Sequence, residues 1–256
     1  MSDPSLFMTR MSIDRPAMLR FGRSFGIPPE LADEGYSVHA LLRALFGEFA
    51  PKPFDSRPSP GRSLALLGYA RAPAAQLADH AMRFADPLAC ACLDLEGLAS
   101  KPMPADWPPS SKLGFDVRIC PVVRSRADTA RMAHGGTRAH AEVDAFLPEA
   151  WNSDASTPLD RGAVYSRWLQ RELSREGAAA LVSARLISFK RTRLARRNHG
   201  DQRGWTRVER PDVTMTGVLE VTGSEAFERL LGRGIGRHRA FGFGMLLLKP
   251  VSTAHA

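Results

Sequence analysis

A proline-rich segment, KPMPADWPPSS at residues 101–111, divides the chain into two stretches in which structural signals follow the same order. Each stretch begins with an apolar extended segment, continues through an amphipathic helix and strand-like runs, and includes a short second helix. This order is typical of a compact α+β unit with helices on one face of an antiparallel sheet. We therefore expect two tandem ferredoxin-like (RRM-like) domains, residues 1–104 and 112–256, although no sequence repeat relates them.

Residues 35–49, GYSVHALLRALFGEF, carry the clearest helix pattern of the first half. The apolar residues of this segment recur at helical spacing and form one core-facing stripe: Val38, Leu41, Leu42, Leu45, Phe46 and Phe49. The other elements expected in this half are extended structure over residues 6–14 and 17–22, a strand over residues 63–71, a short helix over residues 72–84 and a strand over residues 87–97.

The second half opens with a strand pattern over residues 112–123. Residues 125–157 are polar and weakly periodic, so we expect an insertion outside the core. Asp160 is expected to cap a helix that buries Val164, Trp168, Leu169 and Leu173. The last expected elements are a strand over residues 215–223, a short helix capped by Ser224 and ended by Gly232, and an apolar strand over residues 245–250.

The charge and cysteine content limit the class of protein. Lysine and arginine exceed aspartate and glutamate by 35 to 27, a formal charge of +8, and an arginine surplus favours a phosphate-bearing partner over a merely basic surface. The start of the chain has no signal-peptide pattern and no apolar run is long enough to cross a bilayer, so we expect a cytoplasmic protein without a membrane partner. Three cysteines do not make a disulfide framework, and Cys90 and Cys92 are read as small buried hydrophobes on one strand face rather than as metal ligands.

A glycine-rich loop, RGIGRHRAFGFG at residues 233–244, precedes the last strand. Its glycines are Gly234, Gly236, Gly242 and Gly244, and between the two pairs lie Arg237, His238 and Arg239. Glycine lets the backbone approach a ligand closely, so such a loop can surround a phosphate with N–H groups while the basic side chains supply countercharge. The loop runs from helix into strand, which excludes a Walker A loop and a dinucleotide fingerprint. Ile235 and Phe243 are expected to anchor it against the sheet.

The strongest concentration of positive charge lies in residues 184–211. Its basic residues are Arg185, Lys190, Arg191, Arg193, Arg196, Arg197, Arg203, Arg207 and Arg210, against Asp201 and Glu209 alone. Alternation of apolar and polar residues predicts a strand, and Asn198–Gly200 would turn it into a basic hairpin that lies along an RNA stem. Trp205 either stacks on a base or packs within the protein.

Three segments in order carry a family resemblance: YSVHALL in the first helix, WLQREL in the middle, and GVLEVTGSEAFERLLGRGIGRHRAFGFGMLLLKP at the end. Together they resemble the CRISPR repeat-RNA endoribonucleases of the CasE type, the RNA-processing subunits of type I-E Cascade. The resemblance leaves residues 125–157 unaccounted for. It implies two ferredoxin-like folds, cleavage without metal or cofactor by 2′-OH attack to give a 2′,3′-cyclic phosphate and a 5′-OH, and retention of the product within Cascade. The implied partners are the CRISPR repeat hairpin and other Cascade subunits.

His39 is the candidate for acid–base chemistry, because an imidazole titrates near neutrality. Tyr36, His39 and Arg43 share one polar face of their helix, and Ser37 or a nearby residue is expected to cap it. The resemblance implies that His39 is catalytic and that Tyr36 assists, with His238 in reserve. The residues expected to bind RNA are Arg43, Arg185, Lys190, Arg191, Arg193, Arg196, Arg197, Gly234, Gly236, Arg237, His238, Arg239, Gly242 and Gly244.

Three questions stay open from the sequence. Lys190 and Arg191 are candidates to stabilise the phosphorane charge, but spacing does not select the cation that does so. His134, His140 and Asp144 have no standard metal-ligand spacing, and no metal site is expected. A catalytically silent RNA-binding subunit would share every binding feature, and a nucleotide-dependent enzyme is the second alternative.

Overall fold

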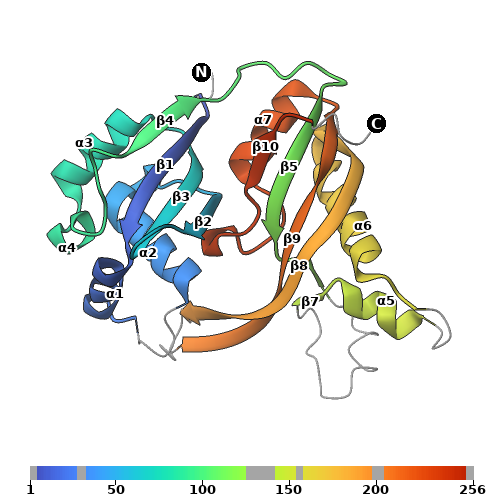
Figure 1. Ribbon diagram of the computed structural model, residues 1–256, viewed down its shortest axis with the longest axis horizontal. Helices are drawn as coiled ribbons and strands as arrows, with labels where there is room; N and C mark the ends of the chain where they lie inside the picture. Colours follow the sequence, from blue (N-terminus) through green and yellow to red (C-terminus); the bar gives the residue numbers. More distant parts are fainter. Residues whose placement is uncertain (1–4, 28–32, 125–141, 154–157, 198–204, 252–256) are drawn as a thin grey trace.

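The computed structural model describes residues 5–27, 33–124, 142–153, 158–197 and 205–251. Two α+β units lie side by side, each with an antiparallel sheet on the face turned toward the viewer in Figure 1 and helices behind it. The elements of the first unit are β1 (Phe7–Asp14), α1 (Arg15–Ser24), α2 (Glu34–Phe46), the 3₁₀ turn η2 (Gly47–Phe49), β2 (Phe54–Pro58), β3 (Ser63–Ala70), α3 (Ala74–Phe84), α4 (Pro87–Cys90) and β4 (Ala99–Pro102).

The second unit contains a second sheet and a small two-stranded sheet. Its elements are β5 (Lys112–Ile119), β6 (Val122–Arg124), β7 (Glu142–Asp144), α5 (Phe146–Asn152), α6 (Arg161–Leu173), η4 (Arg175–Gly177), β8 (Ala179–Arg197), β9 (Trp205–Val221), α7 (Ser224–Arg233), η5 (Arg239–Phe241) and β10 (Leu246–Lys249). The strand orders β2-β3-β1-β4 and β8-β9-β5-β10 are equivalent, with the first strand of each unit between its third and its last. This is the ferredoxin-like arrangement, and the fold class expected from the sequence is confirmed.

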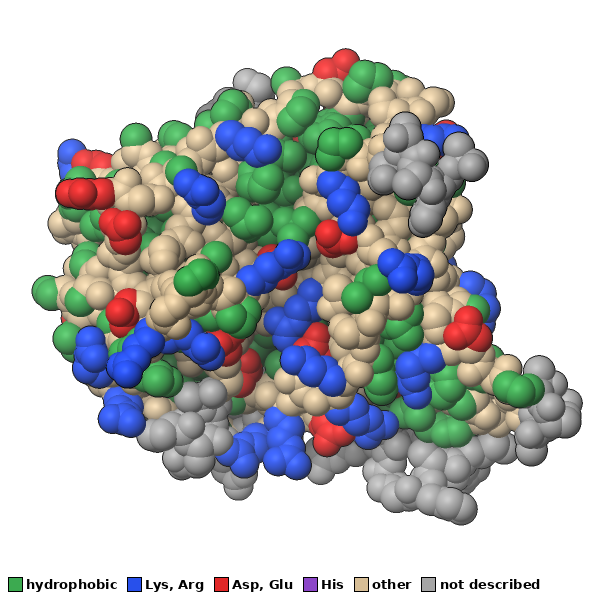
Figure 2. Space-filling view, in the orientation of Figure 1, with side chains coloured by type: hydrophobic (Ala, Val, Ile, Leu, Met, Phe, Trp, Pro, Cys, Tyr) green, Lys and Arg blue, Asp and Glu red, His purple; other side chains and the backbone are tan. Residues whose placement is uncertain are grey.

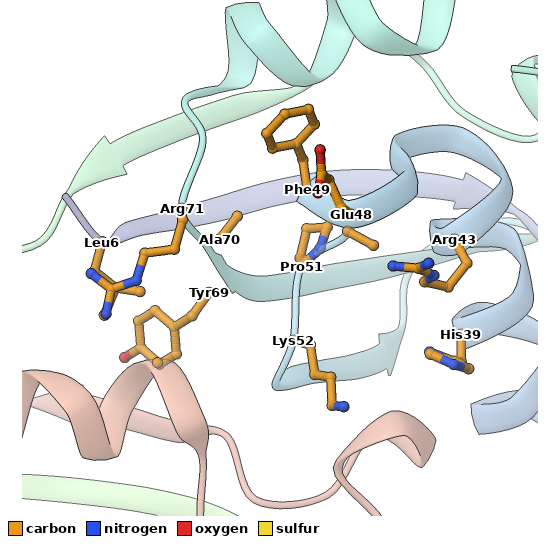
Figure 3. Close-up of a pocket in the computed structure, with 12 residues that line it drawn as sticks. Leu6, His39, Arg43, Glu48, Phe49, Pro51, Lys52, Tyr69, Ala70 and Arg71 are labelled. Carbon is orange, nitrogen blue, oxygen red and sulfur yellow. The ribbon is translucent and has the colours of Figure 1, made fainter. Parts of the chain in front are cut away.

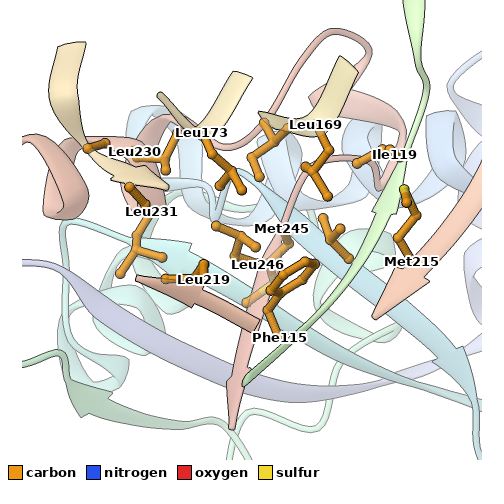
Figure 4. Packing of buried hydrophobic residues seen from close by; sticks show 14 of the residues in the cluster. Phe115, Ile119, Leu169, Leu173, Met215, Leu219, Leu230, Leu231, Met245 and Leu246 are labelled. Atoms are coloured by element: carbon orange, nitrogen blue, oxygen red, sulfur yellow. The ribbon is translucent and has the colours of Figure 1, made fainter. Parts of the chain in front are cut away.

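The two cores form where the sequence pattern places apolar residues. In the first unit the predicted stripe is buried from Val38 to Phe46 of α2, with Val38 and Leu41 wholly inaccessible. Phe49, also expected in the stripe, lies in η2 and is half-buried. In the second unit α6 and α7 cover the sheet, and Leu169 and Leu230 meet Phe115 of β5 in the same cluster (Figure 4). The expected cap of α6 is confirmed, since Asp160 accepts hydrogen bonds from the N–H groups at the start of that helix.

Two helix starts in the first unit contradict the expected extended segments. Asp14 caps α1 and accepts a hydrogen bond of 2.6 Å from the N–H of Ala17, so residues 17–22 are helical. Asp86 caps α4 in the same way, and the strand expected over residues 87–97 is wrong. The sheet strand is instead β4, which begins later and uses the first residues of the expected linker. In both helices a capping aspartate precedes a proline in the first turn, a helix-start signal that outweighs the apolar content.

Cys90 and Cys92 consequently do not share a strand face. Cys90 ends α4, and Cys92 lies in the turn that follows it. Burial raises the pKa of Cys92 to about 11, which suits a small apolar side chain rather than a reactive thiol. The interpretation as a buried hydrophobe is confirmed for Cys92, whereas Cys90 is only half-buried, and the strand expected for both is wrong.

The second unit differs from expectation at the insertion and at α7. Within residues 125–157, the described part includes β7, which pairs with β6, and α5, and Val143 is buried. Ser224 does not cap α7; its hydroxyl donates to Asp106 and accepts from the N–H of Trp107, which ties the interdomain segment to the helix. The helix continues through Gly232 to Arg233 and ends at Gly234.

Candidate active site and nucleic-acid interface

Helix α2 begins at a cap that also contacts the second unit. Asp33 accepts hydrogen bonds from the N–H groups of Gly35 (2.8 Å) and Tyr36 (3.4 Å), so the cap is a neighbour of Ser37 and not Ser37 itself. The other carboxylate oxygen of Asp33 accepts from the N–H of Ala195 in β8 at 3.4 Å. His39 therefore lies in the second turn of a helix whose start is fixed against the long hairpin of the other unit.

His39 lines a pocket of about 410 Å³ together with three basic side chains, Arg43, Lys52 and Arg71 (Figure 3). Arg43 donates to the backbone oxygen of Gly47 at 2.6 Å, and Arg71 forms an ion pair of 2.8 Å with Glu228. No described residue hydrogen-bonds to the His39 ring or to the Lys52 ammonium. These two groups therefore face the pocket with their polar atoms available to a ligand.

The surroundings of His39 favour its neutral form. Burial lowers the pKa of His39, and the positive charges of Lys52 and Arg43 lower the pKa further. An imidazole that is neutral near pH 7 can accept a proton from a hydroxyl group.

Lys52 and Arg71 are the site residues that the sequence analysis missed. Lys52 lies in the loop before β2, a strand that was not expected, and Arg71 directly follows β3. Isolated basic residues outside a charge cluster give no signal in a single sequence. Only the folded chain places them beside His39.

Tyr36 connects three parts of the molecule through its ring. Its centroid lies 5.1 Å from that of Trp205 in an edge-on arrangement and 6.2 Å from that of Phe241. Trp205 belongs to β9 and Phe241 to η5 of the glycine-rich loop. The packing interpretation of Trp205 is therefore the one that the structure supports, and Tyr36 lies beside the His39 pocket without lining it.

The glycine-rich loop packs against residues of both units. All four glycines have positive φ, and a Cβ atom on Gly236 would lie 2.6 Å from the Trp168 ring of α6, while one on Gly234 would lie 2.8 Å from Pro53. Ile235 and Phe243 are buried, which confirms both expected anchors. The N–H of Gly244 donates to the backbone oxygen of Arg118 in β5 at 2.7 Å. Glycine is thus required here by backbone conformation and close packing.

The three basic residues of this loop already contact protein groups. Arg237 and His238 contact the carboxylate of Glu142 at 2.7 and 2.9 Å, and Arg239 donates to the backbone oxygen of Arg233. Arg237 is 45% exposed, whereas the His238 side chain is 3% exposed. Arg237 is therefore the loop cation that a ligand can reach most easily.

The basic residues of the β8–β9 hairpin point to both sides of the sheet. Lys190 lies 3.5 Å from Asp212, an acid that the charge count from residues 184–211 did not include, and Arg191 pairs with Glu209 at 3.1 Å. Arg185 and Arg193 are exposed, and the side chains of Arg196 and Arg197 lie outside the described residues. The expected hairpin turn, Asn198–Gly200, also lies outside them.

Neither Lys190 nor Arg191 lines the His39 pocket. Lys190 borders a groove of about 890 Å³ between β2 and the second sheet, where Arg118 forms a bidentate pair with Asp212. Figure 2 shows Lys and Arg side chains gathered where the two units meet and along the lower edge of this face. The hairpin and the pocket are therefore separate basic regions.

Among the described residues there is no group of three His, Cys, Asp or Glu side chains arranged to hold a metal ion. Asp144 accepts a hydrogen bond from the Tyr165 hydroxyl, whereas His134 and His140 lie outside the described residues. In the same described ranges, no helix has the length and apolar character to span a bilayer.

Two equivalent four-stranded antiparallel sheets, with a positive-φ glycine loop before the last strand, define a tandem ferredoxin-like protein. The family model for CRISPR associated proteins matches residues 6–250, so the chain belongs to that family. This agrees with the resemblance carried by the three sequence segments. A comparison with curated proteins finds no match.

Solved structures share the fold at low sequence identity. Thermus thermophilus Cse3 bound to an RNA representing a pre-cleavage complex has 17% identity and a TM-score of 0.60, covering 96% of this chain and 100% of its own. The CRISPR-associated protein Cas6e from Escherichia coli K-12 has 20% identity and a TM-score of 0.57, with coverage of 96% and 100%. A chain of a CRISPR RNA-guided surveillance complex has 13% identity and a TM-score of 0.56, with the same coverage.

Proposed function

We propose that this protein is a metal-independent endoribonuclease that cleaves CRISPR precursor RNA at the repeat hairpin and keeps the mature RNA within a Cascade assembly. Support comes from its family and from a fold shared with RNA-bound Cse3, Cas6e and a subunit of a surveillance complex. The observation that carries the proposal is the pocket in which a half-buried His39 faces Lys52 without a protein partner among the described residues.

The proposed reaction begins with the ribose 2′-OH beside the scissile phosphate. His39, held neutral by burial and by neighbouring cations, accepts the 2′ proton as the oxygen attacks phosphorus. Lys52 and Arg43 face the negative charge that develops on the phosphorane oxygens, and Tyr36 helps to position the RNA. As the P–O5′ bond breaks, the leaving O5′ takes a proton from solvent water and His39 returns the 2′ proton to solvent, which leaves a 2′,3′-cyclic phosphate and a 5′-OH. No step requires a metal ion.

The proposed binding surface combines two elements. The exposed arginines of β8 contact phosphates along the RNA stem, and the glycine-rich loop contacts a phosphate near the cleavage site through Arg237. The N–H groups of Gly234, Gly242 and Gly244 donate to backbone oxygens of the protein, so the phosphate-binding role expected for these N–H groups is not part of the proposal. Residues 1–104 would form the domain that carries the acid–base helix, and residues 112–256 the domain with the insertion, hairpin and loop. We place the reaction in the cytoplasm, where its RNA substrate is transcribed.

A gel assay in EDTA tests this proposal with repeat RNA from the same genome. Wild type is expected to release a cyclic-phosphate product, and His39→Ala to bind the hairpin without cutting it. His80→Ala serves as the matched control, because His80 lies in α3 and does not line the pocket.

Two other results would change the conclusion. If wild type binds the hairpin but never cuts it, the protein is a silent RNA-binding subunit. If wild type does not bind the hairpin, the proposed substrate is wrong.

A further inference from the structure

Glu142 contacts three basic side chains that come from two distant parts of the chain. Its carboxylate contacts Arg237 at 2.7 Å and His238 at 2.9 Å in the glycine-rich loop, and Arg210 of β9 at 3.2 Å. Its hydrogen bond with His238, followed by the one with Arg237, lowers the pKa of Glu142, so the group is a carboxylate at neutral pH. One acid thus links the loop to the hairpin.

The position of this carboxylate is fixed by the strand that carries it. Glu142 begins β7, which pairs with β6, and Asp144 two residues later accepts hydrogen bonds from Tyr165 and Arg161 of α6. The Glu142 side chain is only 13% exposed. Residues 125–157, expected to be an insertion outside the core, therefore contribute a carboxylate with a fixed position to the loop contact.

The loop conformation at this contact needs support from its surroundings. His238 has φ 60° and ψ 25°, a left-handed conformation that residues other than glycine seldom adopt. The next residues form η5, where Phe241 meets Tyr36 and its backbone packs against Gly35 at the start of α2. The geometry of the loop is thus coupled to the helix that carries His39.

Arg237 keeps donors available while it is held. Its Nη1 donates to Glu142, and the side chain is 45% exposed. A guanidinium has five N–H donors in a fixed plane, so a carboxylate on one side orients the remaining donors toward a ligand on the other.

We propose that Glu142 is a positioning residue for RNA: it holds the glycine-rich loop in shape and aims Arg237 at a phosphate of the bound hairpin. This inference rests on the proposed function. By charge alone a carboxylate beside an RNA surface would weaken binding, whereas we expect Glu142 to strengthen it.

The first test measures affinity of the full chain for a synthetic repeat hairpin by fluorescence anisotropy. Glu142→Gln, nearly the same shape without the charge, is expected to bind about tenfold more weakly, the loss typical of one charge-assisted hydrogen bond. The slope of log affinity against log salt should also become shallower, since one phosphate contact is lost. Glu225→Gln is the control, because Glu225 is 92% exposed and pairs with Arg229 on the surface. Equal or tighter binding by Glu142→Gln overturns the proposal.

The second test asks whether the effect acts through Arg237. Arg237→Gln, a change at an exposed side chain that leaves the core intact, should weaken binding to a similar degree. Adding Glu142→Gln to it should change affinity less than twofold, since the oriented group is already gone. If Glu142→Gln keeps its full effect in that background, Arg237 does not carry it and the proposal fails.

A measurement without RNA tests whether Glu142 holds the loop in shape, independently of RNA binding. Amide hydrogen exchange over residues 233–244 should be faster in Glu142→Gln than in wild type, at similar thermal stability. If Glu142→Gln shows unchanged exchange and normal RNA binding, the role of Glu142 is overturned and the proposed function stands. A wild-type protein that does not bind the hairpin overturns the proposed function and this inference together.

Discussion

The hydroxyl of Tyr69 donates a hydrogen bond of 2.9 Å to the backbone oxygen of Leu246, and this bond joins β3 of the first unit to β10 of the second. Both residues are buried, and Leu6 of the first unit also lies in the apolar cluster of the second. The two sheets are therefore held in a fixed relation, which the pocket between them requires because Gly232 of α7 lines it together with His39.

Replacing Tyr69 tests this junction. Tyr69→Phe keeps the ring but leaves the buried oxygen of Leu246 without its donor, which should lower the free energy of unfolding by about 1–3 kcal/mol. Urea denaturation monitored by circular dichroism measures the change. Tyr36→Phe is the comparison, because no described residue hydrogen-bonds to the Tyr36 hydroxyl; an equal loss in both variants would contradict the prediction.

The pH dependence of cleavage follows from the lowered pKa of His39. A general base works only when deprotonated, so the rate should rise with pH through the His39 pKa and level off above it. In the RNA-free protein, NMR titration should place that pKa below the usual value of about 6.5. A single-turnover rate that falls as pH rises through this range would show that His39 acts as an acid instead.

Lys52→Ala should affect both catalysis and the titration of His39. Loss of a cation facing the phosphorane should slow cleavage by about 10²–10³, the usual cost of one transition-state donor. Loss of the same charge should also raise the His39 pKa, because Lys52 lowers it in the wild type. Lys101→Ala, at an exposed lysine of β4, is the control. A slower reaction with an unmoved His39 pKa would mean that Lys52 does not act beside His39.

Gly236→Ala should destabilise the loop more than an ordinary change at a positive-φ glycine. The new Cβ would lie 2.6 Å from the Trp168 ring, whereas at Gly61, with a similar φ of 79°, no atom lies within 4 Å. Backbone strain alone costs of the order of 1–3 kcal/mol at either site. The excess loss of unfolding free energy in Gly236→Ala over Gly61→Ala, read from thermal or urea unfolding, measures the packing contribution. No excess would mean that the loop and α6 adjust freely.

Local patterns account for most of what the sequence analysis predicted correctly. The stripe of α2 and the cap at Asp160 depend on neighbours a few residues apart, and their signals survive in the folded protein. The differences at α1 and α4 are also local: Asp14 and Asp86 each cap a helix with a proline in its first turn, and this start signal overrides the apolar content of the segments that follow.

The sequence by itself determined the family, the fold class of two α+β units with antiparallel sheets, the buried stripe of α2, and the choice of His39 and the glycine-rich loop as candidates. Only the tertiary structure placed Lys52 and Arg71 beside His39, brought Glu142 to Arg237, and separated Lys190 from the pocket. The physical reason is the sequence separation between the residues that interact. Helix periodicity and capping arise between residues a few positions apart, whereas the pairing of charges across a pocket depends on how strands and loops far apart in the chain pack together.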